Sequence, residues 1–107
     1  MTNTFVNASN AISSSGTVIY TCPSATTAVI HSVFISNVSA SSSDTIEIKM
    51  TSSARSSTYH IGKNIPIAVG SSLILDKPIV LQASDTLTFT SGANSTLEAT
   101  LGILQIS

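Results

Sequence analysis

Apolar and polar side chains alternate along several short stretches of this chain. In residues 44–51 the apolar Ile46, Ile48 and Met50 alternate with polar residues, and in residues 85–90 Leu87 and Phe89 alternate with threonines. A period of two places one set of side chains on one face of a β-strand and the other set on the opposite face. Both stretches are therefore predicted to be strands with one apolar and one polar face.

Similar stretches follow at close spacing and are separated by Ser, Gly, Asn, Asp and Pro, the residues typical of turns. None shows the apolar period of an amphipathic helix. The pattern predicts an all-β fold with eight or nine short strands. We expect a single-domain β-sandwich over residues 1–107, jelly-roll or immunoglobulin-like, in preference to a small barrel. The predicted strands are residues 17–21, 28–37, 44–51, 56–61, 65–69, 72–75, 79–81, 85–90 and 96–106.

The strand predicted over residues 28–37 is apolar on both faces. Ile30 and Phe34 lie on one side. The other side carries Val29, Val33 and Ile35. Such a strand suits the middle of a sheet that is covered on both sides. The side chains singled out for the core are Phe34, Ile48, Leu87 and Phe89.

The last predicted strand changes its pattern at Gly102. Before this glycine the odd-numbered positions are apolar, whereas Leu104 and Ile106 add large aliphatic side chains to the face that was polar. A glycine at such a point marks a bulge or a close approach of two backbones. Either the N-terminal segment of the same chain or a neighbouring subunit must cover the added apolar surface. The predicted interface residues are Phe5, Val6, Leu104 and Ile106.

Charge is scarce in this chain: 8% of the 107 residues are charged and the net charge is −1. The four cations are spread along the sequence, so nucleic-acid binding is not expected. No apolar run is long enough to span a membrane, and the first residues lack the features of a secretory signal. We therefore expect synthesis in the cytoplasm and no membrane partner. The single cysteine, Cys22, is predicted to be a small core thiol and not a reactive one.

Candidate catalytic groups are few and isolated. His31 falls inside a strand, where a structural role with one hydrogen bond is the expected one, and His60 is expected to be exposed. The five acidic residues stand apart, and none has the spacing of a metal site or a carboxylate pair. Asp85 begins a strand, where its carboxylate is expected to accept backbone N–H groups. The chain is predicted not to be an enzyme and to need no cofactor or metal.

Two segments of the chain carry a recognisable pattern, VIYTCPSATTAVIHSVFISN (18–37) and LILDKPIVLQASDTLTFTS (73–91). The first ends a strand in Tyr-Thr-x-Pro and, after a loop, closes a long apolar strand on Asn. The second carries an L-x-x-x-D-x-L turn and strand. The residues of this pattern are Tyr20, Thr21, Pro23, Asn37, Leu81, Asp85 and Leu87. The pattern resembles that of the small β-sandwich virion proteins of tailed bacteriophages, in which Val or Ala stands where this chain has Cys22.

The resemblance implies a structural role in a virion, and decoration or cementing of the capsid is favoured over a neck or tail ring subunit. Its implied partners are copies of the chain itself and other virion proteins, either the major capsid protein or tail and neck proteins. A carbohydrate-binding or adhesin module is the alternative of another class. That alternative depends on Tyr59, because sugar sites present exposed aromatic rings beside polar groups.

Overall fold

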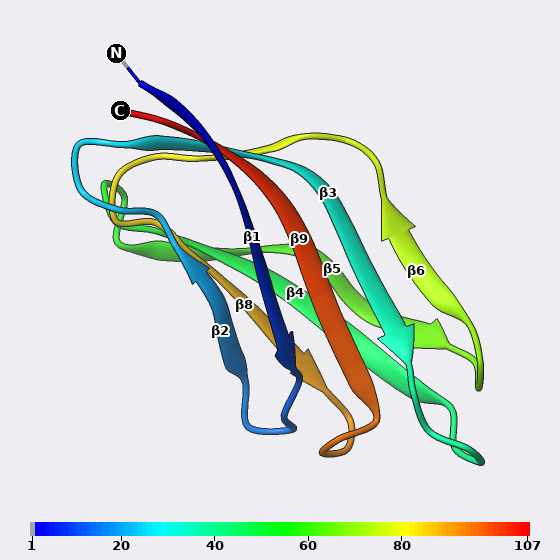
Figure 1. Cartoon of the computed structure of the whole chain (residues 1–107). Helices are drawn as coiled ribbons and strands as arrows, with labels where there is room; N and C mark the ends of the chain where they lie inside the picture. Colours follow the sequence, from blue (N-terminus) through cyan, green and yellow to red (C-terminus); the bar gives the residue numbers. More distant parts are fainter. Residues whose placement is uncertain (1) are drawn as a thin grey trace.

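A computed structural model describes residues 2–107 as a two-layer β-sandwich (Figure 1). This part of the chain contains no helix with the length and apolar character needed to cross a membrane. The nine strands confirm the all-β prediction. They are β1 (Asn3–Ala11), β2 (Thr17–Thr21), β3 (Thr27–Asn37), β4 (Asp44–Ser52), β5 (Ser57–Ile67), β6 (Ser72–Leu75), β7 (Ile79–Leu81), β8 (Thr86–Ser91) and β9 (Leu97–Ile106).

The strands pair as a hairpin folded over on itself. β1 pairs with β9, β2 with β8, β3 with β7 and β6, and β4 with β5, each time antiparallel. The first sheet has the order β1-β9-β3-β6, with β7 also on β3, and the second has the order β2-β8-β4-β5. These orders of a five-stranded and a four-stranded sheet, with nested strand pairs, are those of a jelly roll, and they decide against the immunoglobulin-like alternative.

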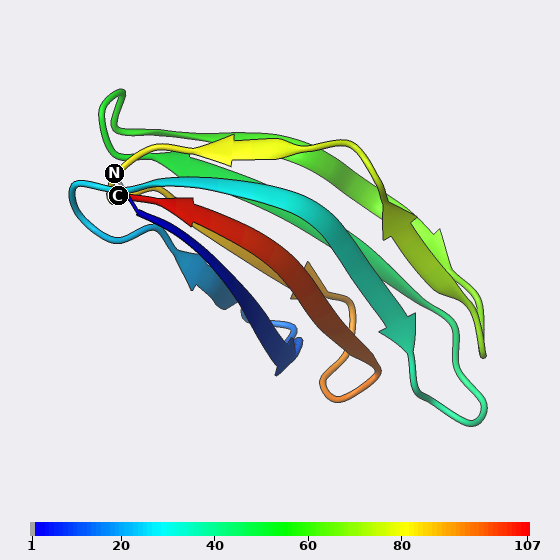
Figure 2. The same ribbon diagram turned by 45° about the horizontal axis from the view of Figure 1, so that its top comes forward.

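The termini lie side by side at one end of an elongated sandwich of 46 × 27 × 19 Å (Figure 2). Thr2 and Ser107 exchange two backbone hydrogen bonds of 2.7 and 2.9 Å. The β1–β9 ladder therefore runs without a register shift to the end of the described chain.

One apolar core fills the space between the two sheets. Every second side chain of β8 and of most of β9 points into it, as the sequence pattern predicts. Leu87, Phe89 and Ile48 are fully buried, which confirms their place in the core. The other buried apolar residues are Ile12, Cys22, Ala28, Ile30, Val33, Ile35, Ile46, Ile67, Leu81, Leu97, Ala99, Leu101 and Ile103.

The prediction for Phe34 is wrong: its side chain is 43% exposed on the outside of the first sheet. The register between β3 and β9 shifts between Ile30 and Ser32, so His31 is an extra residue in β3. A bulge of one residue reverses which positions face inward. Ile30 lies inside before the bulge, whereas Val33 and Ile35 lie inside after it.

Two strands differ from the predicted set. β1 was not predicted as a strand, since its sequence NTFVNASNA lacks a clear alternation. The predicted strands 56–61 and 65–69 form the single strand β5, which absorbs two register shifts against β4. Pro66 lies in β5 at the edge of the second sheet, where the missing N–H group costs no ladder hydrogen bond.

Asp85 connects the turn between β4 and β5 with the turn between β7 and β8. Its carboxylate is 2% exposed and accepts hydrogen bonds from the N–H groups of Gln82 and Ser53, both at 2.9 Å. The expected architectural role of this residue is confirmed. At the other end of the sandwich, the buried Asn37 amide donates to the carbonyl oxygens of Ser42 and Ile67.

Candidate functional site: the outer face of the first sheet

Four apolar side chains form one row across the outside of the first sheet. Phe5 of β1 lies beside Leu104 of β9, Leu104 beside Val29 of β3, and Val29 beside Val80 of β7. Phe5 is 75% exposed and Val80 is 56% exposed, while the two central residues are half-buried. We call these four residues the apolar row. Large apolar side chains that are exposed to water and adjacent to one another are typical of a surface that contacts another molecule.

A second apolar pair lies further along the same face. Phe34 of β3 is the cross-strand neighbour of Ile74 of β6, which is 57% exposed. Nine large apolar side chains are exposed in residues 2–107, and four of them, Phe5, Phe34, Ile74 and Val80, belong to this face. The β3 bulge places Phe34 here, because without it this ring would point into the core.

His31 lies between the apolar row and this second pair. The rings of His31 and Phe5 pack in a T-shaped arrangement, with 6.4 Å between centroids and an interplanar angle of 80°. The two residues come from β3 and β1, on either side of β9, and they meet above Gly102. A Cβ at Gly102 would lie 3.0 Å from His31 Cε1 and 2.8 Å from Ser32 Oγ. The sequence signal at Gly102 therefore marks a close approach, and the bulge itself is in the neighbouring strand.

Three of the four predicted interface residues share this face. Phe5, Leu104 and Ile106 lie on the outside of the first sheet, and Ile106 and Leu104 are half-buried. Phe5 lies beside Leu104 and extends the apolar surface without covering it. Val6 points to the other side of β1 and packs against the core.

The outer face of the second sheet has a different character. Its central strand presents Thr86, Thr88 and Thr90, and the neighbouring strand β4 presents Glu47 and Lys49, which form an ion pair at 3.4 Å. Hydroxyls and charges keep such a surface solvated. The contrast between the two faces singles out the first sheet as the candidate contact surface.

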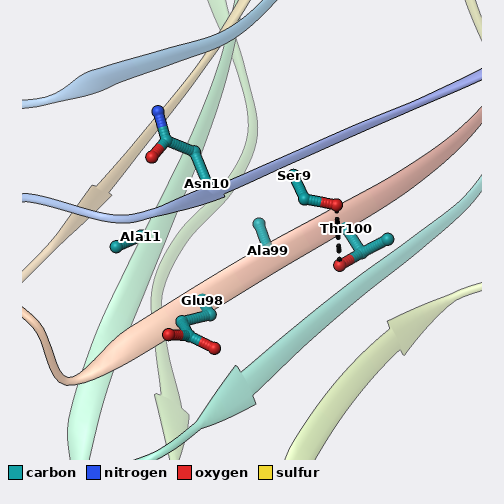
Figure 3. Close-up of a pocket in the computed structure, with 6 residues that line it drawn as sticks. All are labelled: Ser9, Asn10, Ala11, Glu98, Ala99 and Thr100. Carbon is teal, nitrogen blue, oxygen red and sulfur yellow. Dashed lines mark hydrogen bonds between the residues drawn. The ribbon is translucent and has the colours of Figure 1, made fainter.

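The polar end of the first sheet holds a shallow hollow of about 250 Å³ between β1 and β9 (Figure 3). Ser9 Oγ donates to Thr100 Oγ1 at 3.2 Å on its rim. Glu98 is the one carboxylate that lines it, and no histidine or cysteine does. The hollow therefore lacks the paired groups that acid–base catalysis needs. Its lining residues are Ser9, Asn10, Ala11, Glu98, Ala99 and Thr100.

The histidines do not form a catalytic group together. His31 is exposed on the first sheet, and within residues 2–107 its side chain makes no hydrogen bond, so the expected structural hydrogen bond is not found. His60 is exposed on the second sheet, as predicted, and lies 3.5 Å from Glu47 Oε2. This solvated pair of His60 and Glu47 does not include the nucleophile that covalent catalysis needs.

The remaining reactive groups have structural partners. The Asp44 carboxylate accepts the N–H groups of Gly92 and Ala93 at 2.9 and 3.1 Å. Cys22 is buried, and its thiol donates to the carbonyl oxygen of Thr26 at 3.3 Å. Burial raises the pKa of this thiol above its ordinary value of 9.0, and the charge of Asp85 adds to the effect. In residues 2–107 no three His, Cys, Asp or Glu side chains are grouped to hold a metal ion.

Comparison with known proteins gives a shared fold and no sequence family. No family model matches the chain, and no curated protein matches it. A protein of the Bacillus endospore appendages, which form a novel family of disulfide-linked pili, has a TM-score of 0.60 at 15% identity, over 99% of this chain and 87% of that chain. A chain of the T13 IBDV viral particle has a TM-score of 0.59 at 7% identity, over 96% of this chain and 30% of that chain.

A pentameric capsid protein isolated from metagenomic phage sequences has a TM-score of 0.40 at 19% identity, over 92% of this chain and 59% of that chain, and this is too low to carry an argument. The other two structures share so little sequence identity with this chain that their similarity shows the fold alone. That fold is found in a protein of disulfide-linked pili and in a chain of a viral particle.

Proposed function

We propose that the chain is a non-enzymatic structural protein of a tailed-phage virion, which self-associates and decorates or cements the capsid as a single domain. The observation that carries the proposal is the apolar row on the outside of the first sheet. Burying apolar surface stabilises by about 25 cal/mol per Å², so a row of four such side chains favours association. The partners are copies of the chain itself and other virion proteins, and no nucleic acid or membrane takes part.

The second observation in support is the way the titratable groups are used. The carboxylates of Asp44 and Asp85 hold turns, and the two histidines lie on opposite outer faces. An enzyme of this size needs a nucleophile, a base and an orienting group in one cleft. The fold shared with a pilus and a viral particle agrees with a building block of an assembly.

Two other functions compete with capsid decoration. A neck or tail ring subunit would use the same face, and it differs only in the place of the chain on the particle. A carbohydrate-binding or adhesin module would use Tyr59, which is 46% exposed. The guanidinium of Arg55 lies 5.5 Å from the centroid of that ring, so a cation already occupies part of the aromatic surface.

The double variant Leu104→Ser, Ile106→Ser tests the proposal. We expect it to keep the circular dichroism of the native chain, to lose self-association in sedimentation velocity and to lose binding to purified capsids. Val18→Ser is the matched control, because Val18 is 55% exposed on the second sheet. Outright unfolding of the double variant, or unchanged assembly, contradicts the proposal.

Immunogold labelling of particles with an antibody against the chain separates the places within a virion. Label over the head supports decoration, and label at the neck or tail supports the ring subunit. Label on no particle, together with binding to a glycan array that Tyr59→Ala abolishes, favours the carbohydrate-binding module and overturns the virion role.

A further inference from the structure

The free edge of β1 presents a regular row of backbone groups. Thr2 exchanges both hydrogen bonds with Ser107, and Ile12 N–H donates to the carbonyl oxygen of Leu97 at 2.9 Å. In an antiparallel ladder such bonded positions alternate with positions whose N–H and C=O groups point the other way. Within residues 2–107 no strand pairs with this other edge. The outward-pointing groups belong to Asn3, Phe5, Asn7, Ser9 and Ala11.

Of the outer strands in the described part of the chain, β1 is the one without protection against pairing. Natural sheets protect their edges with short strands, charges, prolines or bulges. β6 and β7 have four and three residues, and β2 has five and a register shift. β5 carries Lys63, Pro66 and two register shifts. β1 has nine residues without a charge, a proline or a shift.

We infer that β1 pairs with β1 of a second copy of this chain, antiparallel and about a two-fold axis at Asn7, so that two first sheets join into one. This inference rests on the proposed self-association and names one of its contacts. The register centred on Asn7 places Asn3 opposite Ala11 of the partner and Phe5 opposite Ser9 of the partner. It is the symmetric register that pairs all nine residues and joins every outward backbone group.

The occupant is a second copy because the edge is complementary to itself. A strand paired with its own copy in antiparallel sense matches each N–H with a C=O, and this register gives about ten hydrogen bonds, a number typical of a specific interface. Each Glu98 lies beside Ala11 at one end of the strand. The two-fold axis therefore sends the two carboxylates to opposite ends of the contact, where they do not repel each other.

In this register the outer faces of the two first sheets form one continuous surface. On one copy the apolar row ends at Phe5, and on the partner the next residues across the sheet are Ser9, Thr100, Phe34 and Ile74. The row of one copy thus continues toward the second apolar pair of the other. The joined sheet of the dimer therefore has one continuous outer face, and each copy contributes its own apolar row to it.

Blocking the edge is the first test. Asn7→Pro removes an N–H group that points away from β9, so no hydrogen bond within the chain is lost. We expect this variant to keep its circular dichroism and to be monomeric in sedimentation velocity at concentrations where the native chain is dimeric. The control Asn7→Ala keeps the N–H group and stays dimeric. A folded Asn7→Pro variant that remains dimeric overturns the inference.

Disulfide trapping tests the register and does not depend on the proline variant. In the Asn7→Cys variant the two new cysteines face each other with Cα atoms about 5.5 Å apart, within the range that a disulfide spans. Under mild oxidation we expect a covalent dimer on a non-reducing gel. The control Asn3→Cys lies on the same strand and face, but its copy is about 27 Å away. Cys22 is buried and does not compete.

The outcomes separate this inference from the function it rests on. Equal trapping of Asn7→Cys and Asn3→Cys, or none of either in a dimeric sample, overturns the β1 pairing and leaves the virion role standing. A native chain that binds capsids as a monomer does the same. A chain that neither self-associates nor binds any particle overturns both.

Discussion

Gly102 of β9 lies directly opposite Ser32 of β3, at the place where β3 gains an extra residue. A Cβ at position 102 would lie 2.8 Å from the Ser32 hydroxyl oxygen, closer than such atoms normally approach. The glycine therefore allows the two backbones to meet while the ring of His31 lies above it and reaches Phe5.

Gly102→Ala is expected to lower the free energy of unfolding by about 1–3 kcal/mol, since overpacking at a tight contact costs that much. Urea denaturation measures the loss. Ser32→Gly in the same background removes the closest atom, and we expect it to restore part of the stability. A Gly102→Ala variant as stable as the native chain would show that the Ser32 and His31 side chains move aside freely.

Phe34→Ala and Phe89→Ala should differ sharply although both remove a phenyl ring from a strand. Phe89 is fully buried, and its truncation should cost about 3–5 kcal/mol because it leaves a cavity in the core. Phe34 is 43% exposed, so its loss should cost about 1 kcal/mol or less. Thermal unfolding of the two variants side by side checks the assignment of faces, and equal losses would contradict it.

Asp85→Ala is expected to cost about 2–4 kcal/mol. The change leaves the N–H groups of Gln82 and Ser53 without their acceptor, and an unsatisfied buried donor costs about 1–3 kcal/mol. Asp76→Ala is the matched control, because Asp76 is exposed in the segment between β6 and β7. Its stability in urea should stay within about 0.5 kcal/mol of the native value. Equal effects of the two changes would show that Asp85 holds neither turn.

Alkaline pH should destabilise the fold through the thiol of the buried Cys22 and the phenol of the half-buried Tyr20. Burial raises the pKa of Cys22 above 9.0 and that of Tyr20 above 10.0. Between the ordinary and the raised pKa values, the unfolded chain has released these protons and the folded chain has kept them. The unfolded state is then favoured, so the free energy of unfolding should fall as the pH rises above about 9.

Urea titrations from pH 7 to pH 11 measure this fall. Cys22→Ala should flatten its first part, because the thiol no longer titrates. In the native chain the thiol should resist alkylation at pH 8 and react at once in denaturant. Stability that rises above pH 9 would contradict the direction of both pKa shifts.

Much of the fold was readable from single-strand periodicity. Strands such as β4 and β8 alternate cleanly because one face meets the core and the other meets water, and Leu87 and Phe89 were placed correctly for that reason. β1 was missed because it lies at an edge, where few of its side chains are buried and no alternation is required. The order of strands is a property of long-range pairing that no local pattern carries.

The sequence predicted only part of the candidate site. One residue, His31, explains most of the difference between the predicted and the observed positions. Leu104 and Ile106 stood out because they break the pattern of their own strand. Val29 and Val80 join them only through cross-strand register, which sequence does not show. The extra residue His31 reverses the faces of β3, so Phe34 moves from the predicted core to the surface.

The nesting of the strand pairs also sets a course for folding. β4 and β5 meet across a short turn, whereas each pair outside them joins segments more distant in the chain, up to β1 and β9. Closing a longer loop costs more chain entropy, and chains rich in distant contacts fold slowly. The central hairpin is therefore expected to form early, with pairing advancing outward to the termini. Until β1 pairs with β9, one edge of β9 has unpaired backbone groups. During that interval a newly made chain is most susceptible to pairing with a strand of another chain.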